Sequence, residues 1–231
     1  MCGRYAITSP LEAIIEAFSL KGPRSNLEPR YNAAPSQYLP VIRGGREGRE
    51  MVPMRWGLVP SWSKGPDSRY SMINARAETV TSKPAYRGPF RYRRCLVPAN
   101  GFFEWKKEAD GKQPYFITLK SDAPFAFAGL WDHWTSPNGS EMETFTIIVT
   151  AANDVVRPIH ERMPVILGED SYESWLGEAG TPSRTKLAIL LRPYPADLMR
   201  AYPVSRAVNS PTNDRPELVE PVPANGQAEL L

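Results

Sequence analysis

The chain has 231 residues, and its 28 Lys and Arg against 25 Asp and Glu give a formal net charge of +3. Hydrophobic residues make up 42% and charged residues 23%, a balance that excludes fibrous and disordered proteins and is typical of a globular domain. The charge is too small to indicate a nucleic-acid-binding protein by itself. No apolar stretch like a signal peptide or membrane span follows the N-terminus, so we expect a cytoplasmic protein.

The clearest helix is predicted near the N-terminus. Residues 9–12 read Ser-Pro-Leu-Glu, the pattern of a capping box with proline at the first helical position. Apolar residues then recur on one helical face: Leu11, Ile14, Ile15 and Phe18.

Short runs typical of strands follow at residues 38–43, 51–59, 71–77, 94–98, 101–106, 115–120, 125–131 and 144–150. Turn residues at 109–111 and 137–139 predict loops between antiparallel neighbours. Helical patterns return at 171–176 and 183–191, and residues 198–204 predict a late strand. We therefore expect one α+β domain over residues 1–210, dominated by antiparallel strands with a few peripheral helices. Residues 211–231 lose periodicity and are expected to form a loosely ordered tail.

Cys2 directly follows the initiator methionine, so removal of one residue would place its α-amine and thiol on neighbouring carbons. Such a 1,2-aminothiol can condense with an aldehyde through the amine and close through sulfur into a thiazolidine ring. Both groups have ordinary pKa values within about two units of neutrality, so a usable fraction of each is nucleophilic. On position alone, the commoner role of such a residue is a small apolar group that begins a strand.

The two cysteines, Cys2 and Cys95, are too few for a disulfide framework, which fits a reducing cytoplasm. A zinc site would have to combine Cys2, Cys95, His133 and His160. No two of these have the close spacing of metal ligands, so we expect neither a metal nor another cofactor.

Polar residues interrupt a predicted strand at residues 72–78. The alternation of a strand puts Asn74 and Arg76 on one face, where an amide and a guanidinium could address a phosphate-bearing ligand together. A solvated edge strand would have the same pattern. Arginines also cluster further along the chain, where a solvated basic face is the commoner explanation: Arg87, Arg91, Arg93 and Arg94.

Two more ionisable residues lie in unusual settings. Strand alternation places Glu104 beside Phe102, among aromatic residues that favour the protonated acid and suit it for proton transfer. A glutamate paired with an arginine would look the same in sequence. His160 lies in a loop bracketed by prolines at residues 158–164, and catalytic groups are often found on loops.

Several motifs occur together in one order: MCGRY at residues 1–5, YNAAP at 31–35, RWGLVP at 55–60, INARAE at 73–78, PANGFFEW at 98–105 and IHERMP at 159–164. In this combination the sequence resembles the SRAP family of SOS-response-associated peptidases or abasic-site processing proteins. The resemblance implies a barrel-like mixed domain with a positively charged groove for single-stranded DNA. It also implies a monomer without metal or cofactor that joins the nucleoid when it binds DNA.

The resemblance implies a role for each of several residues. Mature Cys2 would supply the amine and thiol that trap the ring-opened aldehyde of an abasic site, and Asn74 would position the sugar or the amine. Glu104 would shuttle protons near the Schiff base, and His160 would act on the opened sugar and its leaving oxygen. The implied DNA contacts are Arg4, Trp56, Trp62, Arg76 and Arg162.

The crosslinking chemistry that the resemblance implies is consistent with the reactivity of an abasic site. A thiazolidine removes the electron-withdrawing imine that would drive strand cleavage by β-elimination, so the crosslink would shield the damaged strand. The family's peptidase name fits the removal of Met1, which Glu104 and His160 could assist in cis or an aminopeptidase could perform. A lyase activity is a further expectation.

Two other classes of function are compatible with the N-terminus. An N-terminal-nucleophile hydrolase of the class II glutamine amidotransferase type also begins Met-Cys-Gly and uses its cysteine to attack an amide. The partner motifs of that class, Arg-His-Arg-Gly-Pro and an Asn-Gly-Glu loop, are missing from the sequence. Alternatively, a noncatalytic module could hold single-stranded nucleic acid with its arginines and aromatic residues, with Cys2 purely structural.

Overall fold

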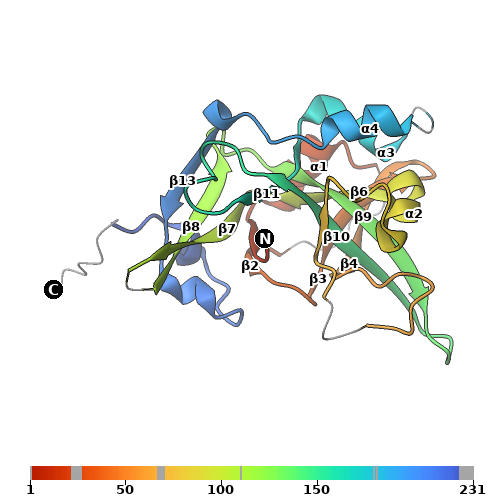
Figure 1. Cartoon of the computed structure of the whole chain (residues 1–231), viewed down its shortest axis with the longest axis horizontal. Helices are drawn as coiled ribbons and strands as arrows, with labels where there is room; N and C mark the ends of the chain where they lie inside the picture. The colour runs from red at the N-terminus through yellow and green to blue at the C-terminus, as the bar shows by residue number, and fades with distance from the viewer. Residues whose placement is uncertain are drawn as a thin grey trace.

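The computed structural model describes residues 2–21, 28–66, 71–109, 111–178, 180 and 182–223. Within these residues the chain is a mixed α+β domain in which strands dominate, as predicted. Figure 1 shows two sheets side by side, with the helices gathered around the larger one. No helix in the described part of the chain is long and apolar enough to cross a membrane.

A closed ring of five strands forms the larger body. Around the ring the strands are β10 (Glu141–Ala151), β4 (Gly48–Trp56), β3 (Tyr38–Gly45), β6 (Arg94–Ala99) and β9 (Phe125–Thr135). The ring closes because β9 pairs with both β6 and β10. Its neighbours are antiparallel except for β4 and β10, which are parallel. The barrel-like arrangement implied by the resemblance is therefore confirmed.

Short strands extend this sheet beyond the ring: β5 (Asn74–Arg76), β11 (Arg162–Pro164) and β12 (Ile166–Leu167). The second sheet is antiparallel and has the order β13 (Met199–Pro203), β8 (Gly111–Leu119), β7 (Gly101–Glu108), β1 (Tyr5–Ile7) and β2 (Arg30–Ala33). The N-terminal segment lies between the two sheets (Figure 1).

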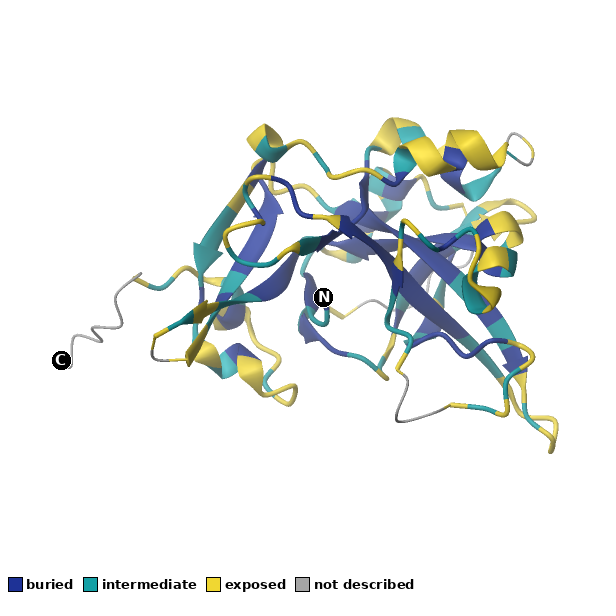
Figure 2. Ribbon diagram, viewed as in Figure 1, coloured by how far each residue is buried: buried dark blue, intermediate teal, exposed yellow. Residues whose placement is uncertain are grey.

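Alternate residues of the barrel strands divide between two hydrophobic clusters. The interior cluster takes residues from every strand of the ring, as a closed barrel requires: Leu39, Met54, Val97, Phe127 and Ile147 are among them. Phe102 and Ile117 of the second sheet join this cluster, so the two sheets share one core. Figure 2 shows the buried strands running through the centre and exposed helix faces outside.

Helices cover the outer wall of the barrel: α1 (Leu11–Phe18), α2 (Pro84–Tyr92), α3 (Tyr172–Leu176) and α4 (Arg184–Leu190). Short 3₁₀ turns complete the chain: η1 (Glu169–Ser171), η2 (Ala196–Leu198), η3 (Arg206–Asn209) and η4 (Pro216–Val219). Ile14 and Phe18 of α1 are buried, as the apolar face predicts. The predicted capping box is wrong, because no side chain caps α1 and the Ser9 hydroxyl instead accepts a hydrogen bond from Asn100 Nδ2.

Two predicted strands are shorter than expected. The run at 51–59 ends at Trp56, because Gly57 has a φ of 118°, a left-handed conformation that favours glycine. The run at 71–77 is reduced to β5, which ends where the backbone turns at residues 77–80. The late strand and both C-terminal helical patterns are confirmed as β13, α3 and α4.

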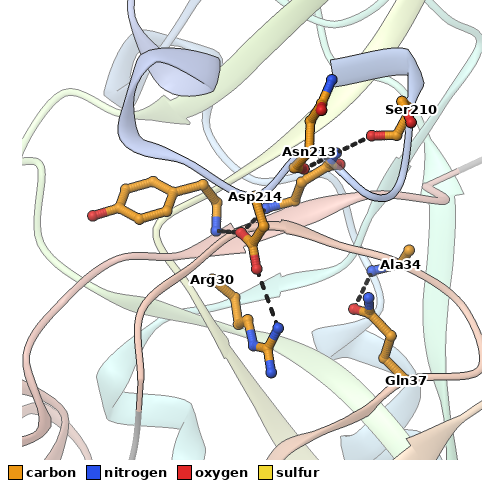
Figure 3. Close-up of polar contacts among 8 residues, drawn as sticks. Arg30, Ala34, Gln37, Ser210, Asn213 and Asp214 are labelled. Atoms are coloured by element: carbon orange, nitrogen blue, oxygen red, sulfur yellow. Dashed lines mark hydrogen bonds and ion pairs between the residues drawn. The ribbon is translucent and has the colours of Figure 1, made fainter. Parts of the chain in front are cut away.

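The prediction of a loose tail is wrong for residues 211–223. The Asp214 carboxylate accepts hydrogen bonds from the backbone N–H groups of Tyr31 and Asn32, at 2.6 and 3.1 Å, and pairs with Arg30 at 3.2 Å (Figure 3). Leu218 is buried against the second sheet. These contacts provide hydrogen-bond acceptors for backbone N–H groups of edge strand β2 and hold residues 211–223 in place. The polar composition of this segment therefore did not indicate that it is ordered. The rest of the predicted tail, 224–231, lies outside the described residues.

Candidate functional site at the buried N-terminal cysteine

Cys2 lies just before β1, and its side chain is fully buried in the interior cluster between the two sheets. Its thiol lies 3.9 Å from the carbonyl oxygen of Arg4. Burial raises the pKa of the Cys2 thiol far above its ordinary value, and the negative charge of Glu104 raises this pKa further. The neutral thiol is therefore favoured, and a base must take its proton before the sulfur can attack.

Strand β5 brings Asn74 into contact with Cys2. This strand runs parallel to β10, and the Tyr86 hydroxyl donates to the carbonyl oxygen of Asn74 at 3.2 Å. The Asn74 Nδ2 donates to the carbonyl oxygen of Cys2 at 2.8 Å. Its Oδ1 is buried and has no hydrogen-bond partner in the described part of the chain. Asn74 thus holds the backbone of Cys2 with its amide nitrogen and offers its oxygen as an acceptor.

Strand β7 carries Glu104 to the same region. Phe102 packs in the interior cluster with Cys2, whereas Phe103 packs in a separate cluster on the other face of β7. Because side chains alternate, Glu104 shares the face of Phe102, as predicted. Glu104 is 3% exposed, and burial raises the pKa of its carboxyl from the ordinary 4.5 to about 7. A carboxyl half protonated near neutrality can both give and take a proton.

His160 lies in the loop that joins β10 to β11. The preceding Ile159 packs against the interior cluster that contains Cys2. In the neutral ring with its proton on Nε2, His160 Nδ1 accepts a hydrogen bond from the Arg162 backbone N–H at 3.0 Å; in the other tautomer Nδ1 donates to the Arg162 carbonyl oxygen at 3.2 Å. Burial lowers the pKa of the imidazole below its ordinary value, which favours this neutral form.

The arginines predicted to contact phosphates differ in their surroundings. Arg76 is exposed at the end of β5, and Arg162 forms an ion pair with Glu78. Arg4 is half-buried and donates to Asn32 Oδ1 and to the carbonyl oxygen of Val208, both at 2.9 Å. Arg4 therefore ties β1 to the C-terminal segment, a structural role that the sequence did not indicate.

The two candidate tryptophans are separated by burial. Trp62 is 66% exposed on the loop after β4. Trp56 is fully buried, stacks on Phe145 at 6.1 Å between ring centroids and donates to the carbonyl oxygen of Ile73 at 3.0 Å. A base cannot stack on a ring enclosed in the barrel, so the expectation for Trp56 is wrong and its role is in the core.

Tyr5 packs in the same interior cluster as Cys2, although the sequence analysis did not include it among the candidate site residues. Its ring lies in the barrel, edge-on to Trp56 at 5.3 Å, and its buried hydroxyl has no hydrogen-bond partner among the residues described. Burial raises the pKa of this hydroxyl, which stays protonated. Its place in the MCGRY motif was the only signal. The described residues contain no cluster of three or more His, Cys, Asp or Glu suited to a metal.

The fold and the site together define a class: strand-dominated α+β domains built around a cysteine at the N-terminus. The sequence matches the SOS response associated peptidase (SRAP) family over residues 1–211. The chain belongs to this family.

Named relatives support the assignment. The chain is 44% identical over 223 residues to the abasic site processing protein YoqW of Bacillus subtilis, covering 95% of this chain and 99% of that protein. It is 34% identical over 265 residues to the abasic site processing protein HMCES of Gallus gallus, covering 96% and 78% of the two chains.

A solved structure has the same fold. The crystal structure of a protein from Bacteroides thetaiotaomicron superimposes with a TM-score of 0.85 at 29% identity, covering 96% of this chain and 100% of that one.

Proposed function

We propose that this protein processes abasic sites by forming a thiazolidine crosslink between mature Cys2 and the ring-opened aldehyde of an abasic site in single-stranded DNA. The names of its relatives support the substrate. The observation that carries the chemistry is the 2.8 Å hydrogen bond from Asn74 Nδ2 to the Cys2 carbonyl oxygen. In addition, the negative charge of Glu104 raises the pKa of the Cys2 thiol.

The reaction begins after Met1 is removed and the α-amine of Cys2 is free. The amine nitrogen adds to the aldehyde carbon, and the resulting carbinolamine loses water to give a Schiff base. The sulfur then adds to the imine carbon while the thiol proton passes to the imine nitrogen. The net change is the loss of one water, with no oxidation or reduction.

The electrostatics favour attack by the amine before attack by sulfur. Because burial raises the pKa of the Cys2 thiol, the neutral thiol waits until the electrophilic imine has formed. Glu104, with a pKa of about 7, protonates the leaving hydroxyl of the carbinolamine and then accepts the thiol proton. Asn74 Oδ1 accepts from the amine, and His160 acts on the opened sugar.

DNA contacts Trp62, Arg76 and Arg162 as it reaches the site. Trp62 supplies an exposed ring for stacking, and Arg76 supplies an exposed cation. A phosphate that contacts Arg162 competes with its ion pair to Glu78. The same Glu104 and His160 assist removal of Met1 in cis, and a lyase step on the opened sugar uses the same groups.

The test combines purified protein with a single-stranded oligonucleotide that contains one abasic site. An adduct that survives denaturation, with a mass equal to protein plus oligonucleotide minus water, is expected. Cys2→Ala should abolish the adduct and retain noncovalent affinity. Cys95→Ala is the matched control, because Cys95 is equally buried but has no free α-amine. An adduct formed by Cys2→Ala, or by protein that retains Met1, would overturn the proposal.

A further inference from the structure

The arginine cluster of residues 87–94 is divided by the structure into two kinds of residue. Arg94 is buried and donates to the carbonyl oxygens of Phe90, Arg91 and Trp175. Arg93 pairs with Asp132 at 3.0 Å. These two arginines hold the fold together, whereas Arg87 and Arg91 are exposed on α2.

Arg87 and Arg91 line a pocket between α2 and α4. Arg184 lines the pocket from α4, and the volume of the pocket is ≈ 400 Å³. Its floor is apolar, because Phe90 and Leu187 are each 2% exposed and belong to the cluster under the helices. A volume of this size lies within the range of small-ligand sites, of about 300–1,000 Å³.

No acidic side chain is among the residues that line the pocket in the described part of the chain. Among the described residues, no aspartate or glutamate forms an ion pair with Arg87, Arg91 or Arg184. The buried cation of Arg94 lies directly behind α2 and also has only carbonyl partners there. Converging arginines without acids favour a multiply charged anion, and the guanidinium fork matches phosphate oxygens.

Two features favour a nucleic-acid strand as the source of that phosphate. Tyr92 follows Arg91 in the chain and is 64% exposed, and the Arg91 guanidinium lies 5.0 Å from the centroid of its ring, an arrangement that suits base stacking. The neighbouring Tyr86 of α2 donates to the carbonyl oxygen of Asn74. The helix that bears the pocket is therefore anchored to the strand that reaches Cys2.

We propose that the pocket between α2 and α4 is a second nucleic-acid subsite, which binds backbone phosphates of the strand that flanks the residue held at Cys2. The strand would pass from Arg76 at the end of β5 along α2, with Tyr92 stacking on a flanking base. The proposal rests on the proposed function for its choice of strand, but the binding it describes needs no reaction at Cys2.

The test measures noncovalent binding of intact single-stranded DNA by fluorescence anisotropy over a series of salt concentrations. The variant Arg87→Gln with Arg184→Gln removes one cation from each helix. Its matched control, Arg46→Gln with Lys120→Gln, removes the same charge from exposed positions outside the pocket. Far-UV circular dichroism and melting temperature confirm that both variants fold.

The pocket variant is expected to bind a long oligonucleotide several-fold more weakly than the control variant does. Loss of two phosphate contacts reduces the slope of log K against log salt by about 1.4, at about 0.7 per contact for single strands. Affinity for an oligonucleotide too short to span both sites should not change. Equal losses in the two variants would mark a general effect of charge and overturn the proposal.

Two further measurements identify the source of the phosphate and distinguish a failure of this proposal from a failure of the reaction at Cys2. Inorganic phosphate and a free mononucleotide are tested as ligands by thermal shift. If either binds in a pocket-dependent way while the affinity for long DNA is the same in the pocket and control variants, the ligand of the pocket is a small molecule and not a DNA strand, and the proposal is overturned. Crosslinking at saturating abasic DNA should be unchanged in the pocket variant. If the parent and both variants form no crosslink, but the pocket variant still binds long DNA more weakly than the control variant, the reaction at Cys2 is refuted and the proposal for this subsite is supported.

Discussion

Glu104→Gln separates the proposed catalytic role of this carboxyl from its cost to stability. Burial raises the folded-state pKa of Glu104 from 4.5 to about 7, so the folded protein binds its proton more tightly than the unfolded chain. Stability from this group is present below about pH 4.5 and is lost as the pH rises toward 7. At about 1.4 kcal/mol per pKa unit, the loss approaches about 3 kcal/mol above pH 7.

Glutamine keeps the shape of the side chain and cannot ionise. The Glu104→Gln variant should therefore lack this pH-dependent loss, and its free energy of unfolding should exceed that of the parent by up to about 3 kcal/mol at pH 8. Urea denaturation at pH 5 and pH 8 measures the difference, with the N-terminus of each preparation defined by intact mass.

The same variant should capture abasic DNA more slowly. In the parent the capture rate should be highest near pH 7, where the Glu104 carboxyl can both give and take a proton, and the variant should lack this maximum. Parallel pH dependence of unfolding in the two proteins, or unchanged capture kinetics, would refute the reasoning. A variant that loses stability and activity together would mark Glu104 as structural.

Three further substitutions test the site and the fold. Asn74→Ala removes the hydrogen bond to the Cys2 carbonyl oxygen and should slow capture, with a loss of about 1 kcal/mol of stability in thermal unfolding; an unchanged capture rate would contradict its positioning role. His160→Ala should slow capture while the melting temperature stays near that of the parent, whereas an equally steep fall in both would make the ring structural. Asp214→Ala leaves two backbone N–H groups of β2 without their acceptor and should cost about 1–3 kcal/mol in urea denaturation. The control Asp154→Ala breaks only an exposed ion pair and should cost less than about 1 kcal/mol; equal costs would show that Asp214 does not hold the edge strand.

The burial of Cys2 places a physical demand on the reaction. The thiol is fully buried in the cluster between the sheets, and its partner Glu104 is almost as enclosed. Low polarity there strengthens the influence of each charge and raises both pKa values. In the proposed reaction the aldehyde of the abasic sugar therefore approaches from the side of the N-terminal amine, so that the amine reacts before the sulfur.

Local patterns predicted elements but not their ends. The apolar face of α1 and the alternation of Phe102 and Glu104 on β7 depend on neighbours in sequence, so they were predictable. The end of β4 depends on the left-handed backbone of Gly57, and the Ser9 hydroxyl is taken by distant Asn100. Intrinsic propensity predicts neither the backbone conformation of Gly57 nor the hydrogen bond between Asn100 and Ser9.

The sequence by itself determined that an N-terminal cysteine, an amide and a carboxyl set among aromatic residues occur in one chain with a β-rich pattern. It could not place Asn74 against Cys2, because that contact joins residues far apart in sequence through the pairing of β5 with β10. Tertiary structure also decided that Trp56 belongs to the core and that Asp214 holds an edge strand. Burial and long-range hydrogen bonding are properties of the closed barrel and its packed neighbour, and no local stretch of sequence contains them.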